Sequence, residues 1–98
     1  MVEVVQSPQF RRDLADAWVY AAEGSEDRAD ALLDAVAETA RLVAENPGIG
    51  RPRPELVGGA TRSVLTARRY LVYYRPAGEG RVEFIRLFHT SRDPDSVG

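Results

Sequence analysis

The residues of this 98-residue chain that are best suited to chemistry lie in its last third. His89 is the single histidine, Arg92 follows it three positions later, and Arg68-Arg69 directly precede Tyr70. An imidazole near a guanidinium could act as an acid or base beside a bound phosphate. Arginines interleaved with a tyrosine could instead hold phosphates and stack bases. The competing interpretation of His89 is a structural histidine that is hydrogen-bonded at the edge of a sheet.

Other classes of site are disfavoured by what the sequence lacks. It has no cysteine and no lysine, and its thirteen Lys+Arg residues are all arginines. Thiolate ligands, cysteine nucleophiles and lysine bases are therefore excluded, and one histidine is too few for a recognisable metal site. The glycine-bearing segment 48–52 follows a predicted helix rather than a strand, so it fits neither a phosphate-binding loop nor a dinucleotide fingerprint. We expect no metal and no cofactor.

Charge is divided unevenly along the chain. Residues 1–50 carry four arginines against ten acidic residues, a net charge of −6, and residues 51–92 carry nine arginines against three glutamates, a net charge of +6. The basic half could meet an acidic protein or a phosphate backbone. The overall charge of −2 argues against non-specific binding of nucleic acid, which favours strongly basic domains. We therefore expect no direct nucleic-acid binding by this chain alone.

The elements that must position these residues begin with two helices. Ser7-Pro8 predicts the start of the first helix, which ends near Gly24, because serine caps a helix and proline suits its first position. Ser25 predicts the cap of a second helix, whose apolar stripe runs until Asn46-Pro47 stops it. The very short turn between them predicts an antiparallel hairpin.

Strand patterns dominate the rest of the chain. Residues 46–61, with four glycines and three prolines, predict a surface loop, and Arg68-Arg69 are expected in an exposed tight turn. Tyr73 and Tyr74 are expected to pack in the core or on a face of the sheet. Strands are predicted at residues 2–5, 62–66, 70–75 and 81–88, with a polar ending at residues 89–98.

This order predicts an α+β fold, with an N-terminal strand and an antiparallel helical hairpin packed on a mostly antiparallel sheet. The length corresponds to one domain spanning residues 1–98. No apolar run approaches the ~18 residues of a membrane span, and the N-terminus lacks the pattern of a secretory signal. We expect a cytoplasmic protein that does not associate with membranes.

Several segments taken together resemble the toxins of the ParE type, in the RelE/ParE superfamily. The similarity covers almost the whole chain in order, and each segment alone is a weak signal. The matching segments are residues 2–5, 8–14 and 18–20, residues 45–56 with Asn46-Pro47-Gly48-Ile49-Gly50-Arg51-Pro52, residues 69–75, and residues 82–93 with His89-Thr90-Ser91-Arg92-Asp93. The fold derived from the residues agrees with the RelE/ParE fold.

The resemblance implies the toxin of a type II toxin–antitoxin module, of the kind found in plasmid and chromosomal stabilisation systems. ParE-type members poison DNA gyrase, whereas RelE-type members cleave mRNA in the ribosome. The lack of lysine, the lack of a tyrosine after Tyr74 and the acidic net charge favour the ParE type. Two alternatives stay open: a RelE-like ribosome-dependent mRNA endonuclease, and a non-toxic module that only binds an antitoxin.

The resemblance also implies partners and places for them. We expect Arg68, Arg69, His89 and Arg92 to engage gyrase or its complex with cleaved DNA, by binding rather than by catalysis. A ParD-like antitoxin would lay an amphipathic segment on the helical hairpin, with Trp18 and Tyr20 as candidate contacts. The expected assembly is a toxin–antitoxin hetero-oligomer in which DNA contacts belong to the antitoxin.

Overall fold

The structure is a computed structural model that describes residues 1–56 and 59–92. Within these residues it contains two helices, five strands and a short 3₁₀ turn. The polar ending was predicted at residues 89–98, but His89 still belongs to the last strand and residues 90–92 form a 3₁₀ turn. Residues 93–98 lie outside the described residues, as does the side chain of Arg92. No helix in the described ranges is both long and apolar enough to cross a bilayer. The elements are β1 (Glu3–Gln6), α1 (Pro8–Gly24), α2 (Glu26–Glu45), β2 (Arg51–Pro52), β3 (Arg62–Thr66), β4 (Tyr70–Pro76), β5 (Arg81–His89) and a 3₁₀ turn η1 (Thr90–Arg92).

Both predicted helices are confirmed, with their predicted caps. The Ser7 hydroxyl accepts a hydrogen bond from the backbone N–H of Phe10 at 2.9 Å, and the Ser25 hydroxyl accepts one from Arg28 at 3.4 Å. Ser25 also ends α1, because its own N–H donates to the carbonyl of Ala21. One residue therefore serves two helices, and the hairpin needs no further loop.

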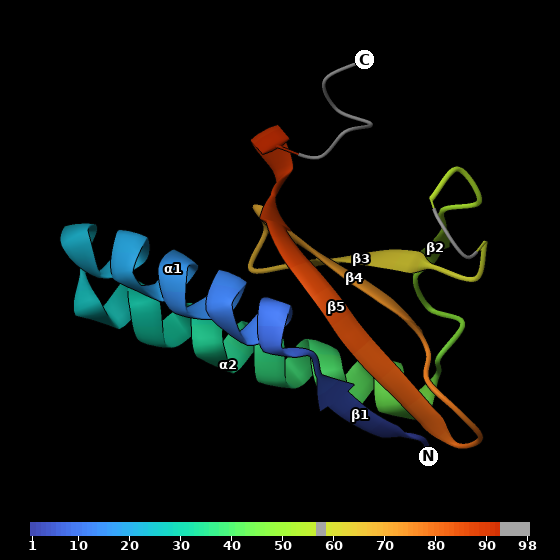
Figure 1. The fold of residues 1–98 in the computed structure, drawn as a ribbon. Helices are drawn as coiled ribbons and strands as arrows, with labels where there is room; N and C mark the ends of the chain where they lie inside the picture. The colour runs from blue at the N-terminus through green and yellow to red at the C-terminus, as the bar shows by residue number, and fades with distance from the viewer. Residues whose placement is uncertain (57–58, 93–98) are drawn as a thin grey trace.

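The hairpin covers one face of a five-stranded sheet of order β1-β5-β4-β3-β2 (Figure 1). The N-terminal strand β1 lies parallel to β5, and the other neighbouring strands are antiparallel. The core lies between hairpin and sheet. Its buried side chains come from both layers and are Phe10, Leu32, Val36, Val43, Val72, Tyr74, Val82, Phe84 and Leu87. The α+β class predicted from the sequence is confirmed.

A β-bulge sends two neighbouring tyrosines of β4 to different partners. The register between β4 and β5 shifts between Tyr73 and Tyr74. Tyr74 packs against Phe84 in the core, whereas Tyr73 packs edge-on against Phe88 with ring centroids 5.4 Å apart. Both tyrosines are buried, as predicted. The guanidinium of Arg53 lies 5.0 Å from the centre of the Tyr73 ring, and Arg53 as a whole is only 1% exposed.

The segment 46–61 is more than the surface loop predicted from its composition. Arg51 and Pro52 form the edge strand β2, opposite Ser63 and Arg62. The Tyr74 hydroxyl donates to the carbonyl of Pro47 at 2.7 Å and accepts from the N–H of Gly50 at 2.8 Å. A strand of two residues has no period to detect, and its partners are ten or more positions away, so the sequence pattern missed it.

Candidate functional site

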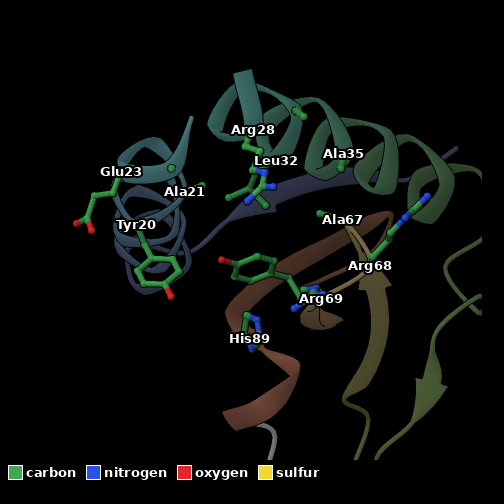
Figure 2. Close-up of a pocket in the computed structure, with 13 residues that line it drawn as sticks. Tyr20, Ala21, Glu23, Arg28, Leu32, Ala35, Ala67, Arg68, Arg69 and His89 are labelled. Carbon is green, nitrogen blue, oxygen red and sulfur yellow. The ribbon is translucent and has the colours of Figure 1, made fainter. Parts of the chain in front are cut away.

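A pocket of about 1000 Å³ opens between the joined ends of the helical hairpin and the β3–β4 turn (Figure 2). Four elements and the turn contribute polar or aromatic side chains to it. These are Tyr20 and Glu23 of α1, Arg28 of α2, Arg68 and Arg69 of the turn, Tyr70 of β4 and His89 of β5. The structure thus brings together Arg68, Arg69 and His89, which the sequence analysis named as candidates for binding a target.

The β3–β4 turn holds its arginines in an unusual backbone conformation. Ala67 has a φ of 50° and Arg68 a φ of 66°, and among the described non-glycine residues these are the two with positive φ. A side chain in this left-handed region costs about 1–2 kcal/mol relative to glycine. The turn is fixed from its other side, because the N–H of Thr90 donates to the carbonyl of Arg69 at 2.7 Å. Both arginines are exposed in a tight turn, as predicted.

His89 ends β5 with one ring nitrogen already engaged. Its Nδ1 accepts the backbone N–H of Ser91 at 3.2 Å and lies 2.8 Å from the Ser91 hydroxyl. Because a backbone N–H can only donate, the neutral ring carries its proton on Nε2. The ring also packs edge-on against Tyr70, with centroids 5.3 Å apart. His89 therefore offers a hydrogen-bond donor to a ligand, and in this arrangement neither nitrogen is free to act as a base.

Arg28 is the lining residue that the sequence analysis missed. It lies in the first turn of α2, more than 35 positions before the other cationic residues of the pocket, so no local motif joins them. In Figure 2, Arg28 reaches from α2 into the space above Arg69 and His89, whereas Arg68 extends along the rim, away from His89. A signal was nevertheless present, since a cation is a poor choice at the start of a helix.

The two aromatic candidates on α1 have different surroundings. Tyr20 is 72% exposed and lines this pocket, and it also lines a second pocket of about 490 Å³ beside it. Trp18 is half-buried and lines neither pocket. Arg92 is the last residue of η1, and the position of its side chain lies outside the described part of the chain.

The second pocket contains a carboxylate that ties α1 to the edge of β5. Asp13 accepts hydrogen bonds from the Arg86 Nε at 2.7 Å, from the backbone N–H of Leu87 at 3.0 Å and from Gln9 at 3.0 Å. Burial raises the pKa of Asp13, but these hydrogen bonds and the nearby Arg86 charge outweigh burial and hold the pKa below its ordinary value. The Ser7 hydroxyl donates to the carbonyl of Ile85, and the Asp13 carboxylate accepts from the N–H of Leu87. These two side chains therefore bond the backbone of β5 beyond the point where its partner strand β1 ends.

Comparison with known proteins identifies the family. Residues 4–94 match the model of the "ParE toxin of type II toxin-antitoxin system, parDE". The chain belongs to the ParE toxin family. It is similar to Toxin ParE1 of Caulobacter vibrioides, with 36% identity over 87 residues that cover 87% of this chain and 85% of that protein. It is also similar to Toxin ParE1 of Mycobacterium tuberculosis, with 32% identity over 69 residues that cover 70% and 68%.

A solved structure described as a chromosomal ParDE TA system from P. aeruginosa has the same fold, with a TM-score of 0.72. It covers 91% of this chain and 96% of that chain at 16% identity, so this likeness supports the fold alone. The resemblance to ParE-type toxins found from sequence segments is thus confirmed. The comparisons assign no role to individual residues of this ParE family member, so those roles are argued from its own geometry.

The geometry of this ParE pocket suits binding better than proton transfer. Its cationic side chains are permanent donors, since arginine stays protonated, and His89 presents a donor as well. Glu23 supplies a carboxylate to the lining, from the last turn of α1. Among residues 1–56 and 59–92 there is no group of three or more potential metal ligands.

Proposed function

We propose that this ParE-family chain is a toxin that acts by binding DNA gyrase and holding it in its cleaved state. The observation that supports this most directly is the pocket, where Arg69 and His89 meet as fixed hydrogen-bond donors. A gyrase–DNA complex offers acidic side chains and phosphates, which guanidinium groups recognise well. Arg68, on the rim of the pocket, and Arg92 belong to the same target-binding surface in this proposal.

The experiment is controlled induction of the chain in cells, with a DNA-damage reporter and bulk protein synthesis followed in one culture. An early reporter rise while translation continues is the expected result, and purified gyrase should then accumulate cleaved DNA in the presence of the chain. Arg69→Ala and Arg92→Ala should lose this effect while the protein stays folded. Arg11→Ala, on the outer surface of α1, removes one charge elsewhere and is the matched control.

The two alternative functions are distinct outcomes of the same experiment. A translation stop without the reporter rise would replace gyrase poisoning with ribosome-dependent mRNA cleavage. The engaged Nδ1 of His89 opposes that reading, because a nuclease needs a base to activate its nucleophile. If neither signal moves although the protein accumulates, the chain is a non-toxic binding module.

For neutralisation, we propose that a ParD-like antitoxin lays a helical segment against the hairpin and contacts Tyr20 and Trp18. Support comes from Tyr20, an aromatic side chain that is 72% exposed between two pockets, as is typical of residues that anchor a partner. Tyr20→Ala should weaken antitoxin binding by roughly tenfold or more. Trp18→Ala tests the second contact by the same titration, and full affinity in both folded variants would remove this part of the proposal.

A further inference from the structure

Unpartnered arginines gather at the pocket. Within the part of the chain that the structure describes, Arg11, Arg28, Arg68 and Arg69 form no ion pair and no side-chain hydrogen bond, whereas Arg41, Arg53, Arg75, Arg81 and Arg86 form ion pairs. Three of these four unpartnered arginines line the one pocket. Among the described residues that line it, Glu23 is the one carboxylate, and in Figure 2 it points away from Arg28 and His89. The pocket therefore keeps a net positive charge, which favours an anionic ligand.

Arg28 lies where the two helices of the hairpin meet. Ser25 is the N-cap of α2, so Arg28 is its third helical residue, where the partial positive charge of the helix start disfavours a cation. Its guanidinium lies beside the C-terminal end of α1, where the helix dipole favours a cation, since a Cβ at Gly24 would be 3.9 Å from the Arg28 Nη1. Glu26 and Asp27 precede it, but neither forms an ion pair with it in the structure. The guanidinium is therefore held beside the pocket without a neutralising side chain.

We propose that this pocket binds a nucleoside phosphate. The Arg28 and Arg69 guanidinium groups and the Nε2–H of His89 would hold the phosphate, and the exposed Tyr20 ring would stack against the base. Its volume of about 1000 Å³ is at the upper end of the range of ligand pockets, so a nucleotide fits. Arg68 lies on the rim and contributes charge at longer range.

The ligand chemistry has two sources, a free nucleotide or the terminal nucleotide of a single strand. Both ligands are compatible with the acidic first half of the chain. Negative charge there disfavours binding along the phosphate backbone of a duplex, but it does not disfavour binding of one phosphate in a pocket. The inference goes beyond the proposed function, because the site would exist whether or not gyrase is the target.

The test is calorimetric titration of the full-length chain at low salt with adenosine 5′-monophosphate and with a 5′-phosphorylated trithymidylate. Saturable binding of either probe is expected, and Arg28→Gln and Arg69→Gln should each weaken it by roughly tenfold. Arg11→Gln is the matched control, since it removes an equally unpartnered arginine outside the pocket, and it should leave affinity within about twofold. Tighter binding of the trinucleotide would assign the strand end, and equal binding would assign the free nucleotide.

Four results would overturn the inference. They are the absence of saturable binding, an equal loss in Arg11→Gln, binding of adenosine as tight as that of its monophosphate, and displacement of the nucleotide by a triglutamate peptide at equal concentration. The last result would assign the pocket to an acidic peptide instead. Tyr20→Leu should weaken nucleotide binding and Tyr20→Phe should retain it, because only the ring is needed for stacking.

Stability and toxicity separate this inference from its alternatives. Arg28→Gln removes no ion pair and no side-chain hydrogen bond within the described residues, so its thermal unfolding should show a folded protein, and lost binding in this variant is then not lost folding. An Arg28→Gln variant that loses nucleotide binding but keeps full toxicity leaves the proposed function standing, because Arg28 is not part of the proposed target-binding surface. Nucleotide binding by a chain that is not toxic would support the inference and refute the proposed function.

Discussion

Replacing Arg68 by glycine should stabilise this protein, although it removes a large side chain. The φ of 66° at Arg68 costs about 1–2 kcal/mol for a side-chain-bearing residue and nothing for glycine. Against this gain stands the greater freedom of glycine in the unfolded chain, worth about 0.4–1 kcal/mol. The Arg68 guanidinium forms no ion pair or side-chain hydrogen bond with a described residue, so no such interaction is lost.

The net gain in the free energy of unfolding lies between about 0 and 1.6 kcal/mol, with a central value of about 0.8 kcal/mol. For a chain of 98 residues the central value raises the melting temperature by about 3–6 °C. Thermal unfolding followed by circular dichroism, together with urea denaturation, measures it. Arg69→Gly is the matched control, because Arg69 is the same residue type in the same turn without a positive φ. It bears only the entropic cost and should lose about 0.4–1 kcal/mol.

The opposite signs of the two variants are the decisive feature. Equal losses in Arg68→Gly and Arg69→Gly would show that the turn is unstrained in solution, and the reasoning from φ would be wrong. If the signs differ as expected, a measurement of the toxicity of Arg68→Gly then tests whether the backbone strain at Arg68 serves function. Lost toxicity in a more stable protein would show that the turn is strained in order to present a guanidinium at the rim of the pocket.

Three further variants test the supports of the fold. Asp13→Asn should lower stability by roughly 1–3 kcal/mol at neutral pH, because four hydrogen bonds from three residues lose a charged acceptor. The pKa of Asp13 in the folded protein lies below its ordinary value, so the stability that its carboxylate contributes is complete above about pH 4–5 and is lost as pH falls through the folded pKa. Urea denaturation at several pH values should therefore show the stabilities of the parent and of Asp13→Asn converging in acid. Gly50→Ala should prevent correct packing of residues 46–56, because a Cβ there would lie 2.6 Å from the Tyr74 hydroxyl and 2.9 Å from the Ser63 carbonyl, and an unchanged melting temperature would contradict this. Tyr74→Phe should cost about 1–3 kcal/mol, since it leaves the Gly50 N–H and the Pro47 carbonyl without their partner; a loss of less than 0.5 kcal/mol on urea denaturation would mean that water replaces the hydroxyl.

Local signals in the sequence were sufficient to predict most elements of the fold. Ser7-Pro8 and Ser25 mark helix starts through bonds that span three residues, so a short window contains the whole interaction. The pairing of β1 with β5 joins residues almost eighty positions apart, and the bulge between Tyr73 and Tyr74 depends on that sheet being formed. Neither the β1–β5 pairing nor the bulge produces a periodic pattern in the sequence, so both became visible only in the structure.

The candidate site was predicted in part for the same reason. Arg68 and Arg69 could be placed in an exposed turn from local patterns, and His89 at the end of a strand. Arg28 joins them only because the hairpin end of α2 packs near the β3–β4 turn, which no spacing in the sequence reports. The burial of Arg53 was also missed, since an arginine that is 1% exposed contradicts the usual preference of this residue for the surface.

Two departures from the usual preferences of surface residues meet at the same pocket. Arg68 sits at a φ that favours glycine, and the Arg28 and Arg68 guanidinium groups both lack a partner among the described residues. Such departures are expected where function sets the residue rather than folding. The two residues lie on separate elements without a shared hydrogen-bond partner, so their effects on stability should add in an Arg28→Gln/Arg68→Gly double variant. That protein should bind nucleotide least and should be more stable than Arg28→Gln by the gain measured for Arg68→Gly alone, and a double variant that is less stable than Arg28→Gln would mean that these arginines support the fold together.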